Sequence, residues 1–378
     1  MDCAKVSDYM LCGDIGGTNS RLKLFSVPRG EAPHGGQVPG ELVHGKEFQN
    51  EFYKTFTDVC TAFIQECETE FKCNFSEMPI KVGNFAVAGP VDSNRVAFTN
   101  RSDWVVDGAD LAAALNIQSV NLINDFVANG YGLLALGEKD TVTLQEGTKK
   151  PNGVVAMLGA GTGLGECFLT CSSHAPGLYD CFPSEGGHSE FAPRTDLEIE
   201  LLQYLKNKFG ENARISYERI VSGKGIGNVY DFMRQRFPKK IDPELDAKIM
   251  SAGDQMGGVV AMNQHSDTLC KWCMEVFYSS YGAEAGSVAL KFLPFGGLYI
   301  AGGIAPKNLE ALMAERKFHG FDIGFKAALL DKGRVSPMLK QIPIKIVLAE
   351  DLGQRGSKYL AFRTLRKLLV DEGLLLVM

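Results

Sequence analysis

The chain has 378 residues, of which 45% are hydrophobic, and its formal net charge at pH 7 is −6 with a pI near 5.6. This composition predicts a globular protein of roughly two or three domains and argues against a broad basic surface for nucleic acid or anionic membrane. No apolar stretch reaches the roughly 18 residues of a membrane helix, and the first residues do not resemble a signal peptide. With ten scattered cysteines, these features predict a cytoplasmic location; a peroxisome-like organelle is the alternative, although the C-terminus carries no clear targeting tripeptide.

The first predicted elements are two strands joined by a glycine-rich turn within residues 9–27. An exposed loop rich in Gly, Pro and His is expected over 28–45, and apolar residues at helical spacing predict a helix between Phe52 and Phe71. The first half continues with two strands and a helix, at 80–88, 120–123 and 126–136.

The second half repeats this order of elements. Its expected strands are 154–158, 165–171, 298–301 and 344–348, and its expected helices are 196–208, 268–292, one beginning near Pro306, and 357–369. The alternation of strands and helices predicts an α/β fold, with two similar domains that face a cleft.

Two glycine turns are the most informative feature of the chain. One is Gly13-Asp14-Ile15-Gly16-Gly17-Thr18-Asn19, and the other is Gly159-Ala160-Gly161-Thr162-Gly163. The backbone N–H groups of such a turn can bind phosphate, and a carboxylate beside a phosphate, as at Asp14, is explained by Mg²⁺ between them. The alternative is an ordinary hairpin turn, because Gly, Asn and Asp are common in turns. The second copy favours phosphate binding.

Asn124 and Asp125 follow a buried strand, where α/β folds present ligand-binding groups. They could equally cap the helix that follows. An ionised carboxylate at Asp125 could also accept a proton from a substrate hydroxyl.

Further polar residues occur in two glycine-containing segments. Glu185 and His188 flank two glycines, and Glu218 adds a further carboxylate in the separate segment 216–223. Such a loop suits a polyhydroxylated ligand, whereas the alternative is a solvated loop, with Glu218 paired to a neighbouring arginine on the surface. The single histidine argues against zinc. Cys270 and Cys273 lie in a helical context and are interpreted as packing residues.

Eight short motifs follow one another along the chain. They are Gly-Asp-Ile-Gly-Gly-Thr-Asn at 13–19, Ala-Gly-Pro-Val at 88–91, Phe-Thr-Asn at 98–100, Leu-Ile-Asn-Asp-Phe at 122–126, Gly-Ala-Gly-Thr-Gly-Leu-Gly at 159–165, Glu-Gly-Gly-His at 185–188, Glu-Arg-Ile-Val-Ser-Gly at 218–223 and Ile-Ala-Gly-Gly-Ile-Ala-Pro at 300–306. In this order they resemble the bacterial-type glucokinases of the actin-like ATPase and sugar-kinase superfamily, from about residue 9 to about residue 365. The chain lacks the Cys-rich zinc motif of the related repressor/kinase family, which favours the glucokinases.

The resemblance implies two actin-like ATPase (ribonuclease H-like) domains of α/β class around a central cleft. The small domain would be 1–135, completed by the C-terminal helix 352–378, and the large domain would be 136–351. The implied reaction is transfer of phosphate from MgATP to the 6-hydroxyl of D-glucose, the first step of glycolysis, giving glucose 6-phosphate and ADP.

The resemblance also assigns roles to residues. Asp125 would be the catalytic base, and Asp14 would face Mg²⁺ through water. The glucose hydroxyls would be bound by Asn100, Asn124, Asp125, Glu185, His188 and Glu218. The ATP cofactor would be bound by Gly13, Asp14, Ile15, Gly16, Gly17, Thr18, Asn19, Gly161, Thr162, Gly163, Gly302 and Gly303.

Two other functions remain open from the sequence. One is phosphorylation of another hexose, such as fructose, mannose or an N-acetylhexosamine. The other is a sugar-sensing regulator, against which the chain shows neither a helix-turn-helix extension nor a basic patch. The expected partners are therefore D-glucose and MgATP, without nucleic acid or membrane. A homodimer is compatible with the chain, whose sequence leaves the oligomeric state open.

Overall fold

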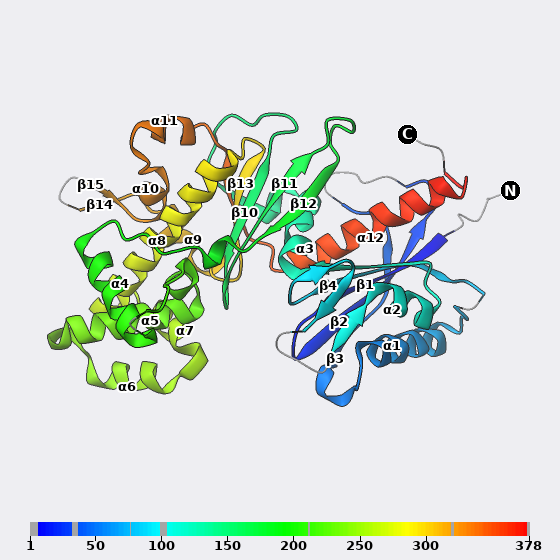
Figure 1. Cartoon of the computed structure of the whole chain (residues 1–378), viewed down its shortest axis with the longest axis horizontal. Coiled ribbons are helices and arrows are strands. Elements are labelled where there is room, and N and C mark those ends of the chain that lie inside the picture. The colour runs from blue at the N-terminus through cyan, green and yellow to red at the C-terminus, as the bar shows by residue number, and fades with distance from the viewer. Residues whose placement is uncertain are drawn as a thin grey trace. The chain divides into compact units, whose positions relative to one another are not determined.

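The computed structural model describes residues 7–31, 37–75, 77–98, 104–210, 212–318 and 321–375, with only the backbone described at 316–318 and 321–323. Its contacts divide the chain into two compact units. Unit 1 comprises Met1–Lys139 and Asp351–Met378, and unit 2 comprises Asp140–Glu350. Each unit is built around a mixed β-sheet (Figure 1). Among the described residues, no helix combines the length and apolar character needed to cross a membrane.

The sheet of unit 1 has five strands in the order β3-β2-β1-β4-β8. The strands are β1 (Ser7–Ile15), β2 (Asn19–Pro28), β3 (Glu41–Gln49), β4 (Ile80–Val87) and β8 (Ser119–Asn124). β1, β2 and β3 are antiparallel neighbours, whereas β4 and β8 run parallel to β1. The C-terminal ends of β1, β4 and β8 therefore share one edge. A small separate sheet contains β5 (Val91–Asp92), β6 (Arg95–Ala97) and β7 (Val105–Asp107).

Helices cover both faces of this sheet, as Figure 1 shows. They are α1 (Phe56–Phe71), α2 (Gly108–Leu115), α3 (Asp125–Gly132) and α12 (Leu352–Asp371). Side chains alternate between the two faces along β1. Leu11 packs in the cluster that contains Phe63 of α1, and Met10 packs in the cluster that contains Phe362 of α12. α12 approaches α3 so closely that a Cβ on Gly356 would overlap the Ala128 carbonyl oxygen.

The sheet of unit 2 has six strands in the order β12-β11-β10-β13-β16-β9. They are β9 (Thr141–Gln145), β10 (Val155–Ala160), β11 (Leu164–Cys171), β12 (Tyr179–Ser184), β13 (Gly297–Ala301) and β16 (Ile344–Val347). β12, β11 and β10 are antiparallel neighbours, and β13 and β16 run parallel to β10. This order repeats that of unit 1, with β9 added at the edge. The predicted α/β fold is confirmed, and the structure shows that the strand order of the two sheets is duplicated.

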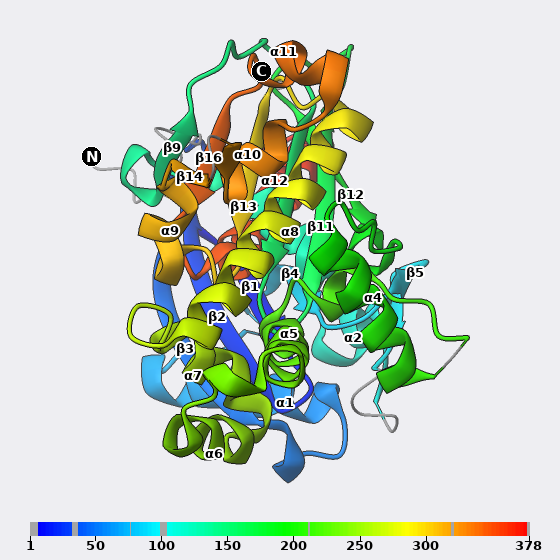
Figure 2. The same cartoon turned by 90° about the vertical axis from the view of Figure 1, so that its left-hand side faces the viewer.

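The long helix α8 forms the centre of unit 2 and packs against β10; in Figure 2 it crosses the view in front of the sheet that contains β13. The helices of this unit are α4 (Asp196–Phe209), α5 (Gly223–Arg236), α6 (Pro243–Ser251), α7 (Met256–Met262), α8 (Thr268–Phe292), α9 (Leu309–Met313), α10 (Phe325–Leu330) and α11 (Ser336–Leu339). A short hairpin joins β14 (Arg316–Phe318) to β15 (Phe321–Ile323). Cys270 and Cys273 of α8 are free, fully buried thiols in the core.

Short 3-10 helices connect several of these elements. They are η1 (Asn50–Phe52), η2 (Leu133–Ala135), η3 (Glu138–Asp140), η4 (Gly186–His188), η5 (Tyr217–Arg219), η6 (Pro238–Lys240), η7 (Gly253–Gln255), η8 (Pro306–Asn308) and η9 (Gly333–Val335).

Three predicted elements differ from the structure. The prediction of a loop over 28–45 is wrong for residues 41–45, because β3 begins at Glu41. β3 is a largely exposed edge strand, so its sequence lacks the apolar alternation that would have indicated a strand. Phe52 lies outside the helical stripe and is 73% exposed, because the helix begins only after the capping box of Thr55. α12 begins at Leu352 rather than near 357, since its first turn contains Gly353 and Gly356, which weaken the helical pattern.

Candidate active site

The turn between β1 and β2 in unit 1 is held by Asn50, a residue that the motifs do not identify. Asn50 is fully buried, and its side-chain amide donates hydrogen bonds to the carbonyl oxygens of Gly16 (2.9 Å) and Gly17 (3.3 Å). Its Oδ1 accepts a hydrogen bond from the hydroxyl of Ser20 (2.7 Å), and its backbone N–H donates to the Thr18 carbonyl (2.8 Å). Because the carbonyl oxygens of Gly16 and Gly17 are bound to the Asn50 amide, their partial negative charges are directed toward Asn50 and do not repel an anion at the N–H groups of the turn.

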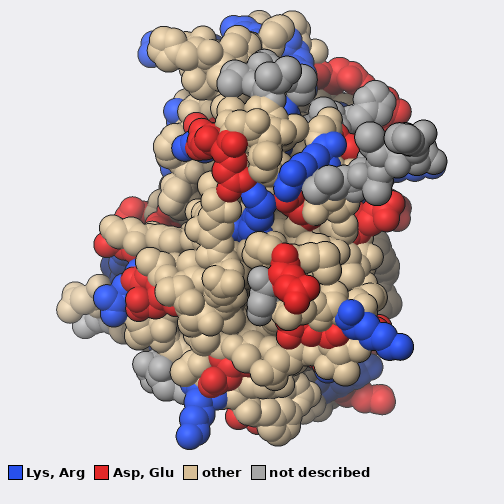
Figure 3. All heavy atoms as spheres, turned by 90° about the vertical axis from the view of Figure 1, so that its right-hand side faces the viewer, with Lys and Arg blue, Asp and Glu red and all other residues tan. Residues whose placement is uncertain are grey.

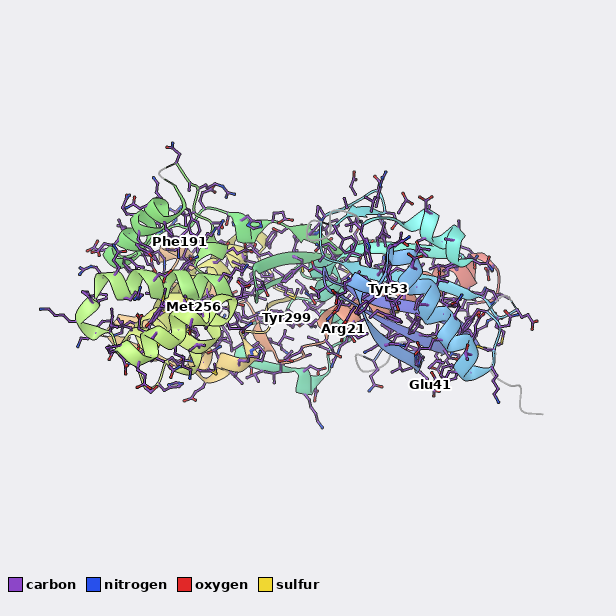
Figure 4. The ribbon with its side chains drawn as sticks, turned by 90° about the horizontal axis from the view of Figure 1, so that it is seen from below. Arg21, Glu41, Tyr53, Phe191, Met256 and Tyr299 are labelled. Carbon is purple, nitrogen blue, oxygen red and sulfur yellow. The ribbon has the colours of Figure 1, made fainter. Side chains whose placement is uncertain are left out.

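Asp14 lies near the end of β1, where its carboxylate is partly exposed. Burial raises its pKa, and Arg21, whose Nη1 lies 3.7 Å from Asp14 Oδ2, partly opposes this rise. Arg21 of β2 is labelled in Figure 4 and also pairs with Glu47 of β3 (3.0 Å). A carboxylate oxygen that remains accessible is the hard ligand that Mg²⁺ prefers, so the donor chemistry of Asp14 fits this ion. The side-chain amide of Asn19 donates to Glu47 (2.6 Å).

Asn124 and Asp125 lie at the end of β8, on the edge that Asp14 also occupies. Asn124 caps α3, because its Oδ1 accepts hydrogen bonds from the N–H groups of Phe126 (2.9 Å) and Val127 (3.2 Å). The capping interpretation is therefore correct for Asn124. Asp125 accepts one bond from the Phe126 N–H (2.8 Å), and its side chain is exposed.

The pKa of Asp125 is raised, first by desolvation from the surrounding protein and then by the negative charge of Asp14. β4 separates β1 from β8, so the two carboxylates lie on strands roughly 10 Å apart. A carboxylate with a raised pKa accepts a proton more readily than an ordinary one, which is the property required of a general base.

Two of the predicted site residues in unit 1 have roles in packing, and a third is not described. Gly13 lies inside β1, where a Cβ would come within 2.7 Å of Phe85 and 2.8 Å of Leu22, so its missing side chain serves packing. Ile15 is buried in the core at 1% exposure. Asn100 lies outside the described residues.

In unit 2, the turn between β10 and β11 carries the second glycine set. The N–H of Gly161 donates to the Gly163 carbonyl, and the N–H of Gly223 donates to the Gly161 carbonyl, both at 2.8 Å. A Cβ on Gly161 would meet no atom within 4 Å, so the outer side of this turn is open. Gly163 differs, because a Cβ there would lie 2.5 Å from Glu218 Oε2.

The turn after the parallel strand β13 lies beside this glycine set. Gly302 has a φ of +83°, and a Cβ would overlap the Ala160 carbonyl oxygen, so both conformation and space require glycine. The N–H of Ile304 donates to the same carbonyl (3.2 Å). Gly303 faces open space. The structure thus brings the glycines of 161–163 and 302–303 to one edge of the sheet in unit 2.

The structure also brings together Glu185, His188 and Glu218. His188 Nε2 lies 3.8 Å from Glu185 Oε2, and His188 Nδ1 lies 3.9 Å from Glu218 Oε1. Glu218 Oε2 accepts a hydrogen bond from the Leu164 N–H (2.9 Å), which fixes its carboxylate against the glycine turn. The Glu185 side chain is 82% exposed, whereas that of Glu218 is 32% exposed. Two carboxylates and an imidazole converge with accessible oxygen and nitrogen atoms.

Two neighbours that the motifs missed support this cluster. The guanidinium of Arg214 donates to the His188 carbonyl, which holds the loop from its far end. Phe191, labelled in Figure 4, packs edge-on against Tyr217 with ring centroids 5.6 Å apart. Tyr217 precedes Glu218, so this contact anchors the segment that carries the carboxylate. Neither residue lies in a recognisable motif, so the sequence carried no signal for them.

Charges on the protein surface are mixed in sign. On the face shown in Figure 3, acidic and basic side chains are interspersed. Accordingly, the binding of an anionic ligand depends on local donors such as the turn N–H groups rather than on a broad basic field.

Comparisons with known proteins agree with this arrangement. Residues 11–364 match the protein family described as Glucokinase. The chain is 38% identical to a glucokinase of Nostoc sp. over 366 residues, which cover 94% of this chain and 99% of that protein.

Solved structures agree as well. The crystal structure of a glucokinase from an Antarctic psychrotroph aligns with a TM-score of 0.73 at 25% identity, covering 94% of this chain and 99% of that one. A glucokinase from Balamuthia mandrillaris, solved in complex with glucose, aligns with a TM-score of 0.66 at 19% identity over 95% of both chains. The predicted actin-like ATPase fold is confirmed by these likenesses.

Proposed function

This chain belongs to the glucokinase family, and from that premise we propose how its residues carry out ATP-dependent phosphorylation of D-glucose. The family's reaction transfers the γ-phosphoryl group of ATP to the 6-hydroxyl of glucose and gives glucose 6-phosphate and ADP. We assign the base to Asp125, the phosphate-binding positions to the two glycine turns, and the sugar-binding positions to the cluster in unit 2.

The observation that carries the assignment is the shared strand edge of unit 1. There the turn braced by Asn50, the carboxylate of Asp14 and the carboxylate of Asp125 occur together. Asp125 is exposed, and its Oδ1 accepts a hydrogen bond from the Phe126 N–H. It would accept the proton of the 6-hydroxyl as the new oxygen–phosphorus bond forms, late in a loose transition state.

The phosphate groups would be bound by backbone N–H groups. Gly17 and Thr18 would present them in the turn of unit 1, and Thr162 and Gly163 in the turn of unit 2. Gly16 and Gly161 would shape the turns instead, because their N–H groups already donate to the carbonyls of Asn19 (2.9 Å) and Gly163 (2.8 Å). Gly302 and Gly303 would lie against the adenosine, because open space at Gly303 admits a flat ligand. Asp14 would hold Mg²⁺ through water, and that ion, when bound, neutralises charge on the phosphates.

The sugar would be bound mainly by Glu185, His188 and Glu218. Each carboxylate can accept hydrogen bonds from two hydroxyl groups, and the imidazole adds one donor or acceptor. An epimer that leaves a desolvated carboxylate oxygen unpaired would lose about 1–3 kcal/mol of binding, which explains a preference for one hexose. Asn124 contributes less than the motif suggests, because its Oδ1 already accepts two backbone bonds.

The assignment of Asp125 is tested by Asp125→Ala. Glucose binding, measured by calorimetry, should remain, whereas turnover with saturating MgATP should fall by about 10²–10⁴-fold, the usual contribution of general-base catalysis. Asp110→Ala, which removes an exposed acidic residue of α2 in the same unit, is the matched control and should keep normal turnover. Turnover in Asp125→Ala within a few-fold of wild type would place the base elsewhere.

A further inference from the structure

Unit 2 contains a pair of buried carboxyl groups outside the site described above. Glu166 of β11 is 2% exposed, and Glu284 of α8 is 1% exposed. Their carboxyl groups are within hydrogen-bonding reach of each other. The Oε1 atom of each is buried without a hydrogen-bond partner among the described residues. Two buried carboxylates so close together cannot both be ionised without a large cost.

The pair lies directly beneath the sugar-binding loop. A Cβ on Gly186 would overlap Glu166 Oε2, so the backbone between Glu185 and His188 rests on this carboxyl group. Ser184 begins the same loop and faces Glu166 across the strand pair of β11 and β12, and its hydroxyl accepts the Gly186 N–H (3.0 Å). The pair is therefore the floor of the loop.

Glu284 also lies close enough to the segment of Glu218 to act on it electrostatically. The negative charge of Glu284 acts on the hydroxyl of Tyr217, the residue before Glu218. Glu166 in turn acts on Tyr281, whose hydroxyl accepts the Ala160 N–H and donates to the Ala301 carbonyl, both at 3.3 Å. The pair therefore lies near the residue before Glu218 and near the tyrosine that binds the ends of β10 and β13.

Two lysines, Lys291 and Lys332, carry positive charge near the pair. Lys291 Nζ lies 3.7 Å from Glu284 Oε1, beyond a direct hydrogen bond. The positive charge of Lys332 also acts to lower the pKa of Glu284, and the Lys332 ammonium donates a hydrogen bond to the Ala283 carbonyl (3.1 Å). The positive charge of Arg194 acts to lower the pKa of both Tyr217 and Lys332. The remaining titratable neighbours are the thiol of Cys167 and the hydroxyls of Tyr217 and Tyr281. A single retained proton lets the pair share one negative charge opposite Lys291.

We infer that Glu166 and Glu284, holding one proton between them, are positioning residues that support the sugar-binding loop from below. The proton joins the two carboxyl groups, which keeps Glu166 under Gly186 and leaves Glu185 and His188 in place for the sugar. Loss of the proton places a second negative charge under the loop, so Glu166 moves toward water and displaces Gly186. This inference rests on the proposed function, because it concerns the glucose affinity of that site.

Charge and burial give the pH range of this effect. Burial, followed by the negative charge of Glu284, raises the pKa of Glu166 to about 8. A folded-state pKa above that of the unfolded chain means that the stability this group contributes is complete below the ordinary pKa of a glutamate and is lost progressively until pH has risen through the folded-state value. Burial raises the pKa of Tyr217 to about 12, so its hydroxyl stays protonated in this range. In the folded protein the protonated pair is the form that holds the loop, so glucose affinity should fall as pH rises above the folded-state pKa of the pair.

The test is the dissociation constant of glucose, measured by calorimetry without nucleotide from about pH 6.5 to about pH 9.5. In the wild type it should be constant near neutral pH and rise by up to about tenfold per pH unit above about pH 8, as one linked proton requires. Glu166→Gln keeps a neutral hydrogen-bonding group, so its affinity near pH 7 should be within about threefold of wild type and should not change at alkaline pH. Glu284→Gln should show the same affinity and the same lack of change at alkaline pH, and it replaces Glu166→Gln in the test if that variant does not fold.

Asp246→Asn is the matched control. It removes another largely buried carboxylate of unit 2, which pairs with Arg234 away from the loop, and it should keep the alkaline loss of affinity. A wild-type affinity that is flat to about pH 9.5, or an alkaline loss that persists in both Gln variants, would overturn the inference. A wild type that neither binds nor phosphorylates glucose near pH 7 would instead overturn the proposed function.

Discussion

Asn50 offers the sharpest test of how the phosphate-binding turn of unit 1 is built. Replacing it by Ala removes the two bonds that its amide donates to Gly16 and Gly17 and the bond that it accepts from Ser20. Ser20 is fully buried, so its hydroxyl loses this acceptor without gaining water. The backbone bond from Asn50 to Thr18 remains, and the turn should loosen rather than unfold.

The size of the effect follows from these contacts. The two bonds to Gly16 and Gly17 contribute about 1 kcal/mol each, and leaving the buried hydroxyl of Ser20 without its acceptor costs ~1–3 kcal/mol. We therefore expect Asn50→Ala to lower the free energy of unfolding by about 3–5 kcal/mol. If the loosened turn costs about 1.4 kcal/mol or more of phosphate binding, the ATP KM rises at least about tenfold.

The assay combines urea unfolding with ATP and glucose KM values in a coupled kinase assay. Asn84→Ala is the matched control, because Asn84 is a fully buried asparagine of the same sheet whose amide donates to Ser357 (3.1 Å), away from the turn. The control should lose stability but keep its ATP KM. An Asn50→Ala variant whose ATP KM matches that of Asn84→Ala would refute the bracing role.

Two further predictions concern the second turn and the pH dependence. In Gly163→Ala, the new Cβ would lie 2.5 Å from Glu218 Oε2 and disturb the bond that this oxygen accepts from the Leu164 N–H. The glucose KM should rise about 10–100-fold, which corresponds to the free energy of one charge-assisted hydrogen bond. Gly161→Ala faces open space, and its glucose KM should stay within about twofold of wild type; equal effects of both variants would contradict the role of Glu218. The raised pKa values of Asp14 and Asp125 mean that activity should fall on the acid side at a pH above the ordinary range of carboxyl groups, because both must be ionised. Arg21→Gln removes the charge that lowers the pKa of Asp14, so this acid limb should move to higher pH, by a small amount that salt screens; a shift to lower pH would contradict it.

The sequence predicted helices and strands correctly where their formation requires a particular pattern of residue types. Helix α8, predicted at 268–292, has the same bounds in the structure, because it is long, apolar and bounded by the cap Asp267. β3 was missed at 41–45, because an exposed edge strand needs no apolar alternation. α5 was missed as well, since its first turn contains Gly223 and Gly225, and Gly225 is there to pack against Ile220.

The same distinction applies to the candidate site. Glycines and carboxylates of the motifs could be found because close backbone approach and charge restrict the residue type at Gly302 and Asp125. Their supports could not be found, because Asn50 and Glu166 act through contacts between strands far apart in sequence. At Gly13 the residue type has a second explanation, because packing against Phe85 also requires the absence of a side chain.

Identification of the reaction product tests the central claim most directly. The purified protein, incubated with MgATP and each member of a hexose panel, should consume ATP with glucose, and ³¹P and ¹³C spectra should show ADP and glucose phosphorylated at carbon 6 in equal amounts. Absence of glucose 6-phosphate, or a higher kcat/KM for another hexose than for glucose, would contradict it.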